Sequence, residues 1–221
     1  GLAFDGDGDR LGVVTKDGEI IYPDRQLMLF AADVLSRVPG ATVIYDVKST
    51  RNLKPWIAEH GGVPMLWKTG HSLIKAKMKE EGALLAGEMS GHVFFADRFF
   101  GFDDAVYAAL RLLEIVAASD RPLHELLADV PLTFSTPELR VDCPDDEKFD
   151  VVTKVLARFR PTNDVVEVDG ARILFDGGWG LVRASNTQPV LVMRFEAQSE
   201  ARLAEIRREV EDAVSAIRAA G

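Results

Sequence analysis

Residues 41–67, ATVIYDVKSTRNLKPWIAEHGGVPMLW, contain the stretch of the chain that decides the fold. Two apolar runs, 42–47 and 63–67, are predicted as strands, and residues 51–60 between them as a helix. The same alternation continues on both sides, with helices predicted at 24–37, 71–80 and 103–117 and a strand at 83–86. Strands that alternate with helices at this spacing indicate βαβ units on a largely parallel sheet with helices on both faces.

The order of elements changes after Pro131. A strand is predicted at 138–142 and a helix at 146–159, and the remaining strands and last helix are predicted at 165–168, 171–175, 179–184, 190–196 and 200–220. This new order, together with Pro131 and Pro137, predicts a domain boundary between the two prolines. The predicted fold class is therefore α/β, a largely parallel sheet domain followed by a smaller α+β C-terminal domain.

The first residues read as part of a different domain. Gly1 to Phe4 is apolar and runs directly into an acidic loop, and short strands are predicted at 2–4, 11–15 and 19–22. This pattern is typical of the end of a sheet domain, so we interpret 1–18 as the C-terminal remnant of a preceding α/β domain. The predicted domains are then 1–18, 19–131 and 132–221.

Composition restricts the class of partner. The chain has 26 basic and 35 acidic residues, and the resulting net charge of -9 opposes binding to nucleic acid and to anionic membrane surfaces. No apolar run reaches the roughly 20 residues that a membrane helix needs. The single cysteine, Cys143, cannot form an intramolecular disulfide. We therefore predict a cytoplasmic protein that binds neither nucleic acid nor membranes, and small anionic ligands would need a local basic pocket.

The loop Asp5-Gly-Asp-Gly-Asp-Arg10 places three carboxylates at two-residue spacing. These carboxylates repel one another unless a cation lies among them, and the glycines between them let the backbone bring them together. Oxygen ligands of this kind suit Mg²⁺. An EF-hand is excluded because its sixth position would be Arg10 and its twelfth Lys16. A solvated acidic turn is the alternative to a metal site at Asp5, Asp7 and Asp9.

Two further loops follow predicted strands. Lys68-Thr-Gly-His71 opens a helix, where backbone N–H groups and the helix dipole favour an anion. Gly87-Glu-Met-Ser-Gly-His92 places a carboxylate, a hydroxyl and an imidazole at alternate positions, which would point one way if the segment is extended. Such a set can bind the neighbouring hydroxyls of a sugar. A solvated loop and a glycine-bounded turn are the respective alternatives.

The segment Arg183-Ala-Ser-Asn-Thr-Gln-Pro189, with Arg194 on the next predicted strand, is the local basic pocket that an anionic ligand would need. A guanidinium can bind a phosphate through two hydrogen bonds, and the hydroxyls, the amide and the loop N–H groups add donors. A plain polar hairpin turn is the alternative reading of this segment.

The four loops occur in the order found in α-D-phosphohexomutases, and the chain resembles the phosphomannomutase/phosphoglucomutase type of this family over nearly its whole length. The resemblance implies an enzyme of four domains, of which this chain would hold the end of the second, the third and the fourth. The missing N-terminal domains of the same enzyme would be its partner and would carry a phosphoserine in a Thr-Ala-Ser-His-Asn-like loop. No Ser-His-Asn occurs here.

The resemblance also implies roles for single residues. Asp5, Asp7 and Asp9 would hold Mg²⁺ against the phosphoserine, and Arg10 would assist catalysis. Glu88 and Ser90 would bind the 3- and 4-hydroxyls of the sugar. The further substrate contacts would be Lys48, His71 and His92, with His92 a candidate for proton transfer, and the phosphate contacts would be Arg183, Ser185, Asn186, Thr187 and Arg194.

The substrates implied are hexose phosphates, namely the 1- and 6-phosphates of glucose and mannose and the 1,6-bisphosphate intermediate. Glu-Met-Ser at 88–90 resembles the bacterial glucose and mannose enzymes, whereas phosphoglucosamine mutases usually have Gln where Met89 stands. Because glucose and mannose differ at carbon 2, a loop that reads the 3- and 4-hydroxyls cannot distinguish them. Dual specificity is therefore expected, and the resemblance to the family also implies a monomer.

Two other functions remain open at this stage. A metal-dependent sugar phosphatase would use one aspartate of the first loop as its phosphoryl acceptor, and Leu2 to Asp7 partly imitates the strand and Asp-x-Asp that it needs. A binding module is the second reading, since this chain lacks the nucleophile. We expect the chain alone to bind sugar phosphates without turning them over.

Overall fold

The computed structural model describes residues 1–220. The chain divides into two compact units, the first spanning Gly1–Pro131 and the second beginning at Leu132. Each unit has its own hydrophobic core, so each is described by itself. The N-terminal strands lie within the first unit, and their assignment to a preceding domain stays a prediction.

Unit 1 opens with a small antiparallel sheet of β1 (Leu2–Phe4), β2 (Leu11–Val14) and β3 (Ile20–Ile21). In β2, Leu11 and Val13 are buried while the residues between and after them are exposed. This alternation is expected of a strand with one face on a core. The acidic loop, residues 5–10, connects β1 to β2.

The main sheet of unit 1 has the strand order β5-β4-β6-β7. Its parallel strands are β4 (Thr42–Asp46), β5 (Val63–Trp67) and β6 (Leu85–Gly87), and β7 (Val93–Phe95) runs antiparallel to β6. Successive residues of β4 enter different cores, since Val43 packs in the larger cluster and Ile44 in the smaller one. Both faces of the sheet are thus covered, as predicted for parallel strands.

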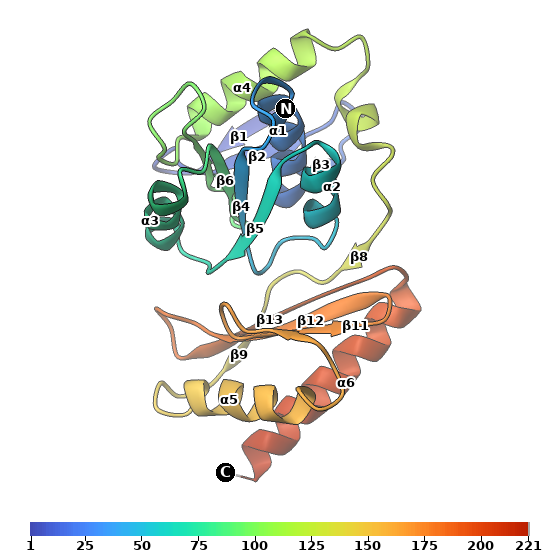
Figure 1. The fold of residues 1–221 in the computed structure, drawn as a ribbon. Helices are drawn as coiled ribbons and strands as arrows, with labels where there is room; N and C mark the ends of the chain where they lie inside the picture. Colours follow the sequence, from blue (N-terminus) through green and yellow to red (C-terminus); the bar gives the residue numbers. More distant parts are fainter. Residues whose placement is uncertain (221) are drawn as a thin grey trace. The chain divides into compact units, whose positions relative to one another are not determined.

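Helices α1 (Pro23–Arg37), α2 (Leu53–Glu59) and α4 (Ala105–Ala117) supply residues to the larger cluster, and α3 (His71–Glu81) supplies Ile74 and Met78 to the smaller one (Figure 1). Proline begins α1, where its missing N–H is harmless. Asp104 caps α4 by accepting a hydrogen bond from Tyr107 N at 2.8 Å. A 3-10 helix, η1 (Leu123–Leu127), ends the unit.

Unit 2 is an antiparallel sheet with two helices. The strand order is β10-β11-β12-β13-β8, and β9 also pairs with β13. Its elements are β8 (Phe134–Ser135), β9 (Leu139–Asp142), α5 (Lys148–Phe159), β10 (Val165–Val166), β11 (Ala171–Phe175), β12 (Gly178–Ala184), β13 (Val190–Ala197) and α6 (Glu200–Ala219). Both helices pack on one face of the sheet (Figure 1). Val155 of α5 and Val210 of α6 belong to a single core.

The alternation along β12 decides where Arg183 points. Val182 and Ala184 belong to the core beneath the helices, so Arg183 lies on the opposite face of the sheet. The predicted α/β class with its α+β C-terminal part is confirmed by this architecture and by the related structures described below. Strands β7 and β8 and the 3-10 helix were not predicted.

Candidate functional site

The acidic loop gathers its three carboxylates. Oxygen atoms of Asp5, Asp7 and Asp9 lie within 4.8 Å of one another. Asp5 Oδ1 accepts hydrogen bonds from the backbone N–H groups of Asp9 (3.2 Å) and Arg10 (3.1 Å), which closes the loop. Gly8 has a φ of 75°, a conformation that other residues rarely adopt. The local sequence therefore produces the cluster.

This cluster fits a divalent cation. Asp9 Oδ1 is buried and makes no hydrogen bond among the described residues, although Arg10 Nε lies 3.5 Å away, and a metal ion would give this oxygen a direct partner. Arg10 Nε lies 2.5 Å from Asp5 Oδ2. Desolvation opposes ionisation of Asp5, but the hydrogen bonds and charge of Arg10 outweigh it and lower its pKa to about 2. Asp5 is thus ionised at neutral pH, as a metal ligand must be.

The segment 87–92 is a turn and not an extended strand. Gly91, with φ 106°, donates its N–H to Glu88 O at 3.0 Å, and Glu88 donates its own N–H to His92 O at 2.9 Å. Glu88 is buried and Ser90 is exposed. The extended segment that would make Glu88, Ser90 and His92 point one way is therefore not formed, and the alternative of a glycine-bounded turn between the two strands describes residues 87–92.

The acidic loop and the 87–92 turn are in direct contact. Leu11 donates its N–H to Gly91 O at 3.2 Å, and Arg10 forms a β-bridge with His92. His92 Nδ1 lies 3.7 Å from Asp9 Oδ2. The candidate metal site and the candidate sugar site, about 80 residues apart in the sequence, are therefore neighbours within unit 1.

Asp103, which the sequence did not indicate, joins this cluster. Its Oδ2 lies 3.1 Å from His92 Nδ1 and 3.7 Å from His71 Nδ1, and its Oδ1 accepts from Lys75 Nζ at 2.9 Å. The rings of His71 and His92 stack with centroids 5.7 Å apart. Burial lowers the pKa of His92, although the charges of Asp9 and Asp103 oppose the shift. The structure thus brings His71 and His92 together around one carboxylate.

The ends of the parallel strands carry the other predicted residues of unit 1. Lys48 is buried just after β4, with Nζ 3.9 Å from Asp46 Oδ2. His71 begins α3, directly after β5 and its loop. Glu88 Oε1 accepts from Gly70 N at 2.6 Å, which ties this loop to the 87–92 turn. The carboxyl ends of parallel strands are where such sheets bind ligands.

The basic loop of unit 2 is held by its own side chains. Ser185 Oγ accepts from the N–H groups of Thr187 (3.3 Å) and Gln188 (3.2 Å), and Arg183 Nε donates to Asp169 Oδ2 at 2.9 Å. Arg183, Ser185 and Arg194 are buried, whereas Asn186 and Thr187 are exposed. Sequence reasoning missed Asp169, which lies across a hairpin from Arg183. Its position in the turn between the strands predicted at 165–168 and 171–175 is the sequence feature that could have identified Asp169.

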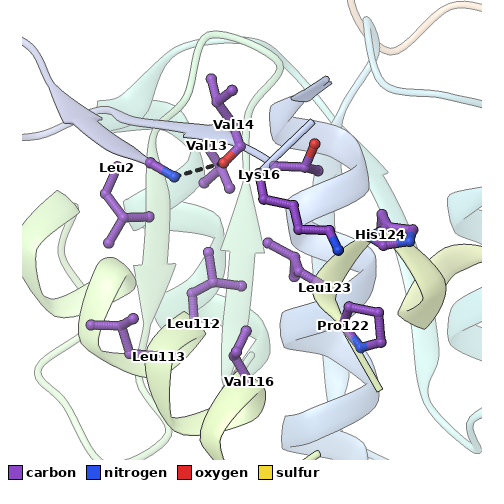
Figure 2. Close-up of a pocket in the computed structure, with 12 residues that line it drawn as sticks. Leu2, Val13, Val14, Lys16, Leu112, Leu113, Val116, Pro122, Leu123 and His124 are labelled. Carbon is purple, nitrogen blue, oxygen red and sulfur yellow. Dashed lines mark hydrogen bonds between the residues drawn. The ribbon is translucent and has the colours of Figure 1, made fainter. Parts of the chain in front are cut away.

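Two hollows of unit 1 differ in chemistry. One of about 390 Å³ is lined by residues that include Asp5, Arg10 and Ser90, and so lies beside the candidate metal loop. Figure 2 shows another, of about 320 Å³, between β1, β2, α4 and the segment at Pro122, lined largely by aliphatic side chains such as Leu112 and Val116. None of the predicted site residues lines the second hollow.

Comparison with known proteins shows the family. Residues 22–134 match the model of the phosphoglucomutase/phosphomannomutase alpha/beta/alpha domain III, and residues 138–213 match the C-terminal domain of the same proteins. The chain belongs to the phosphoglucomutase/phosphomannomutase family. The resemblance inferred from the four loops is therefore confirmed, and the phosphatase alternative gains no support from these matches.

Relatives place the chain within this family. It is 60% identical over 210 residues to a phosphoglucomutase of Neisseria gonorrhoeae and 57% identical over 209 residues to a phosphomannomutase/phosphoglucomutase of Pseudomonas aeruginosa. Each alignment covers 94% of this chain and 45% of the relative. A crystal structure of a family member from Burkholderia thailandensis superimposes with a TM-score of 0.90 at 57% identity, covering 99% of this chain and 46% of that one.

The chain thus spans about half the length of the phosphoglucomutase/phosphomannomutase relatives that it matches. Within residues 1–220, no helix combines the length and apolar character that crossing a membrane requires.

Glu88 gives this family member a testable pH dependence of stability. Desolvation, followed by the charge of Asp46, raises the pKa of Glu88 from 4.5 to about 7. The folded state therefore binds a proton that the unfolded state releases, so this stabilisation is present below pH 4.5 and is lost as pH rises through 7. Glu88→Gln should raise the free energy of unfolding at pH 8 by up to about 3 kcal/mol, with little change at pH 5.

Urea unfolding at both pH values measures this difference. Glu80→Gln, which removes an exposed carboxylate on α3, is the control and should change stability by less than about 0.5 kcal/mol at either pH. An equal effect of Glu88→Gln at pH 5 and pH 8 would contradict the raised pKa.

Proposed function

We propose that this chain supplies the metal, sugar and phosphate sites of a phosphohexomutase that interconverts hexose 1-phosphates and hexose 6-phosphates. The reaction would proceed through a phosphoserine outside this chain and a 1,6-bisphosphate intermediate. The contact between Leu11 N and Gly91 O carries the proposal, because it sets the candidate metal loop against the candidate sugar loop. Phosphoryl transfer to a sugar hydroxyl needs these two sites side by side.

The three loop aspartates would hold Mg²⁺ through carboxylate oxygens, the ligands that this cation prefers. When bound, the cation supplies positive charge that stabilises a transferring phosphoryl group. Arg10 would add a second positive charge next to the loop, where its Nε already pairs with Asp5. Expected ligands are thus Asp5, Asp7 and Asp9.

The sugar would lie against the strand ends of unit 1. Glu88 and Ser90 would bind the 3- and 4-hydroxyls, and Lys48 and His71 would contact the substrate from neighbouring loops. His92 would transfer a proton. Its Nδ1 lies 3.1 Å from Asp103 Oδ2 but makes no hydrogen bond among the described residues, so Asp103 would act on the ring through its charge. These assignments use the neutral side chain that burial of His92 favours.

The phosphate that is not reacting would bind to unit 2. Arg183 presents a guanidinium held in place by Asp169, and the turn around Ser185 orients the backbone N–H groups of Thr187 and Gln188. Asn186 would add an amide and Arg194 a further charge. A mutase must bind its substrate in two orientations, so one phosphate site and a pair of hydroxyl ligands can serve both.

Glucose and mannose phosphates are both proposed as substrates, because a turn that binds only the 3- and 4-hydroxyls does not discriminate between sugars that differ at carbon 2. The name of the Pseudomonas aeruginosa relative, with its two activities, agrees with this choice. A complete enzyme that turns over mannose 1-phosphate only at background rate would contradict it. Magnesium and bound hexose phosphates are accordingly the ligands to test.

Titration calorimetry of the chain with glucose 1-phosphate, with and without Mg²⁺, tests the proposal. Saturable binding is expected without turnover, since the phosphoserine is outside the chain. Arg183→Ala should weaken binding about 10- to 100-fold, the range for losing a charge-assisted hydrogen-bonded pair. The matched control is Arg207→Ala, which removes an exposed arginine of α6 that pairs with Glu211 and should leave affinity unchanged.

Two results would overturn the proposal. Absence of binding by the wild-type chain would mean that the residues of this chain alone do not bind a hexose phosphate. Release of free phosphate from glucose 1-phosphate would indicate hydrolysis. A phosphoaspartate found in the acidic loop would then favour a metal-dependent phosphatase.

A further inference from the structure

Asp46, the last residue of β4, contacts three separate loops. Its Oδ1 accepts hydrogen bonds from Ser49 Oγ at 2.7 Å and from Met89 N at 3.3 Å. Its Oδ2 accepts from Thr69 Oγ1 at 3.1 Å. The side chain is fully buried, with an exposed fraction of 0%. A buried carboxylate needs such donors, so these loops are held to it strongly.

Each of the three loops carries a residue proposed to bind the sugar. Lys48 precedes Ser49, His71 follows the Thr69-Gly70 pair, and Glu88 and Ser90 flank Met89. The loops follow β4, β5 and β6, whose carboxyl ends meet at one edge of the sheet. One carboxylate therefore connects all the strand ends that form the proposed sugar site.

A second hydrogen bond couples the loop after β5 to Glu88. Gly70, next to Thr69, donates its N–H to Glu88 Oε1 at 2.6 Å. Gly70 has a φ of 137°, so the loop takes a conformation that glycine permits and that its two anchors must maintain. A displacement of Thr69 from Asp46 would thus be passed to the carboxylate of Glu88, without any change in Glu88 itself.

We propose that Asp46 is a positioning residue, which fixes the mutual spacing of Lys48, His71 and the 88–90 segment and does not contact the sugar. This inference rests on the proposed function, because it takes these side chains as the sugar ligands. Asp46 acts through two hydroxyls and one backbone amide, so its removal would loosen the site while leaving every sugar ligand in the chain.

Three variants test the inference. Asp46→Asn keeps the shape of the side chain but loses its charge and one acceptor oxygen. Thr69→Val removes the hydroxyl that bonds to Asp46 and leaves the carboxylate in place, so it remains informative if Asp46→Asn folds poorly. Thr69→Ser restores a hydroxyl and is the conservative rescue. Asp97→Asn, a buried carboxylate of unit 1 outside the proposed site, is the matched control.

Calorimetry with glucose 1-phosphate and ¹H–¹⁵N spectra of the same proteins are the two readouts. Asp46→Asn and Thr69→Val should weaken binding about tenfold, and Thr69→Ser by no more than about twofold. The amide resonances of His71 and Ser90, which do not themselves bond to Asp46, should shift in the first two variants and stay in place in Asp97→Asn. Thermal melting of each variant separates this effect from a general loss of stability.

Unchanged affinity in Asp46→Asn and Thr69→Val, with His71 and Ser90 resonances at their wild-type positions, would overturn the inference. So would an equal loss of affinity in Asp97→Asn, since a purely structural role would then explain the result. If the wild-type chain itself fails to bind glucose 1-phosphate, the proposed function is wrong for this chain, and the resonances of His71 and Ser90 still decide whether Asp46 positions these loops.

Discussion

Replacing Arg111 with alanine should lower the free energy of unfolding of unit 1 by about 3 to 5 kcal/mol, the cost of breaking a buried ion pair by removing one partner. Arg111 lies on α4 with a side chain only 2% exposed. Its Nη2 donates to Asp33 Oδ2 and Asp97 Oδ2, each at 2.8 Å. Alanine would leave both carboxylates in place with fewer donors.

Packing adds to this electrostatic cost. The Arg111 guanidinium lies 4.5 Å from the ring centroid of Phe95, and its Nη1 donates to the Asp97 carbonyl oxygen at 3.0 Å. The side chain thus connects α4 to the sheet at β7 and to the chain that follows it. Its loss would leave a cavity as well as unpaired polar groups.

Urea unfolding, with hydrogen exchange to locate the effect in unit 1, measures this loss. Arg37→Ala is the control, because Arg37 bonds to the same two carboxylates but is one-third exposed. It should cost about 1 kcal/mol or less, because Arg37 is partly exposed and Arg111 still donates to both carboxylates in this variant. Arg111→Lys, which keeps the charge without the forked geometry, should fall between the two. Equal costs for Arg111→Ala and Arg37→Ala would contradict the argument.

The fold could be predicted because its periodic signals are strong. The strand at 42–47 is an apolar run that is buried almost throughout, and the run at 63–67 is apolar but only partly buried. Helix α1 begins at Pro23, and α3 lies between Gly70 and Gly82. Strand β7 was missed for a physical reason, since Val93 to Phe95 is three residues long and follows a glycine turn. A segment this short gains its strand conformation from pairing with β6 and not from its own sequence.

The candidate site could be predicted only where residues cluster along the chain. The aspartates of the first loop and the Ser185 loop are local patterns, and the structure forms both loops within a few residues. Asp46 and Asp103 are single carboxylates, and each also accepts from a side chain 20 or more residues away, Thr69 and Lys75 respectively. The predicted helix at 103–117 included Asp103, whereas the structure begins α4 at Ala105 after the cap Asp104 and leaves Asp103 in the preceding loop. Asp46 and Asp103 belong to the candidate site because of tertiary contacts, which a local sequence pattern does not show.

Gly170→Ala should lower the free energy of unfolding of unit 2 by about 3 kcal/mol or more and should also weaken phosphate binding. Gly170 has a φ of 87°, a conformation that costs an alanine roughly 1 to 3 kcal/mol. A Cβ built there would meet Val182 O at 2.5 Å and Arg183 Cα at 2.8 Å. Backbone atoms of β12 cannot move aside as a side chain can, so the strand that carries Arg183 must shift.

Gly177→Ala separates the backbone strain from this collision. Gly177 lies in the same unit with a φ of 75°, but its added Cβ would meet the amide end of Gln198, which can rotate away. Both variants therefore carry the left-handed backbone cost, and only Gly170→Ala displaces the Arg183 strand. Urea unfolding and calorimetry with glucose 1-phosphate should show both variants destabilised, with affinity lost in Gly170→Ala alone. Equal affinities would mean that the Asp169–Arg183 pair tolerates the shift, and the close packing of Gly170 would then serve stability only.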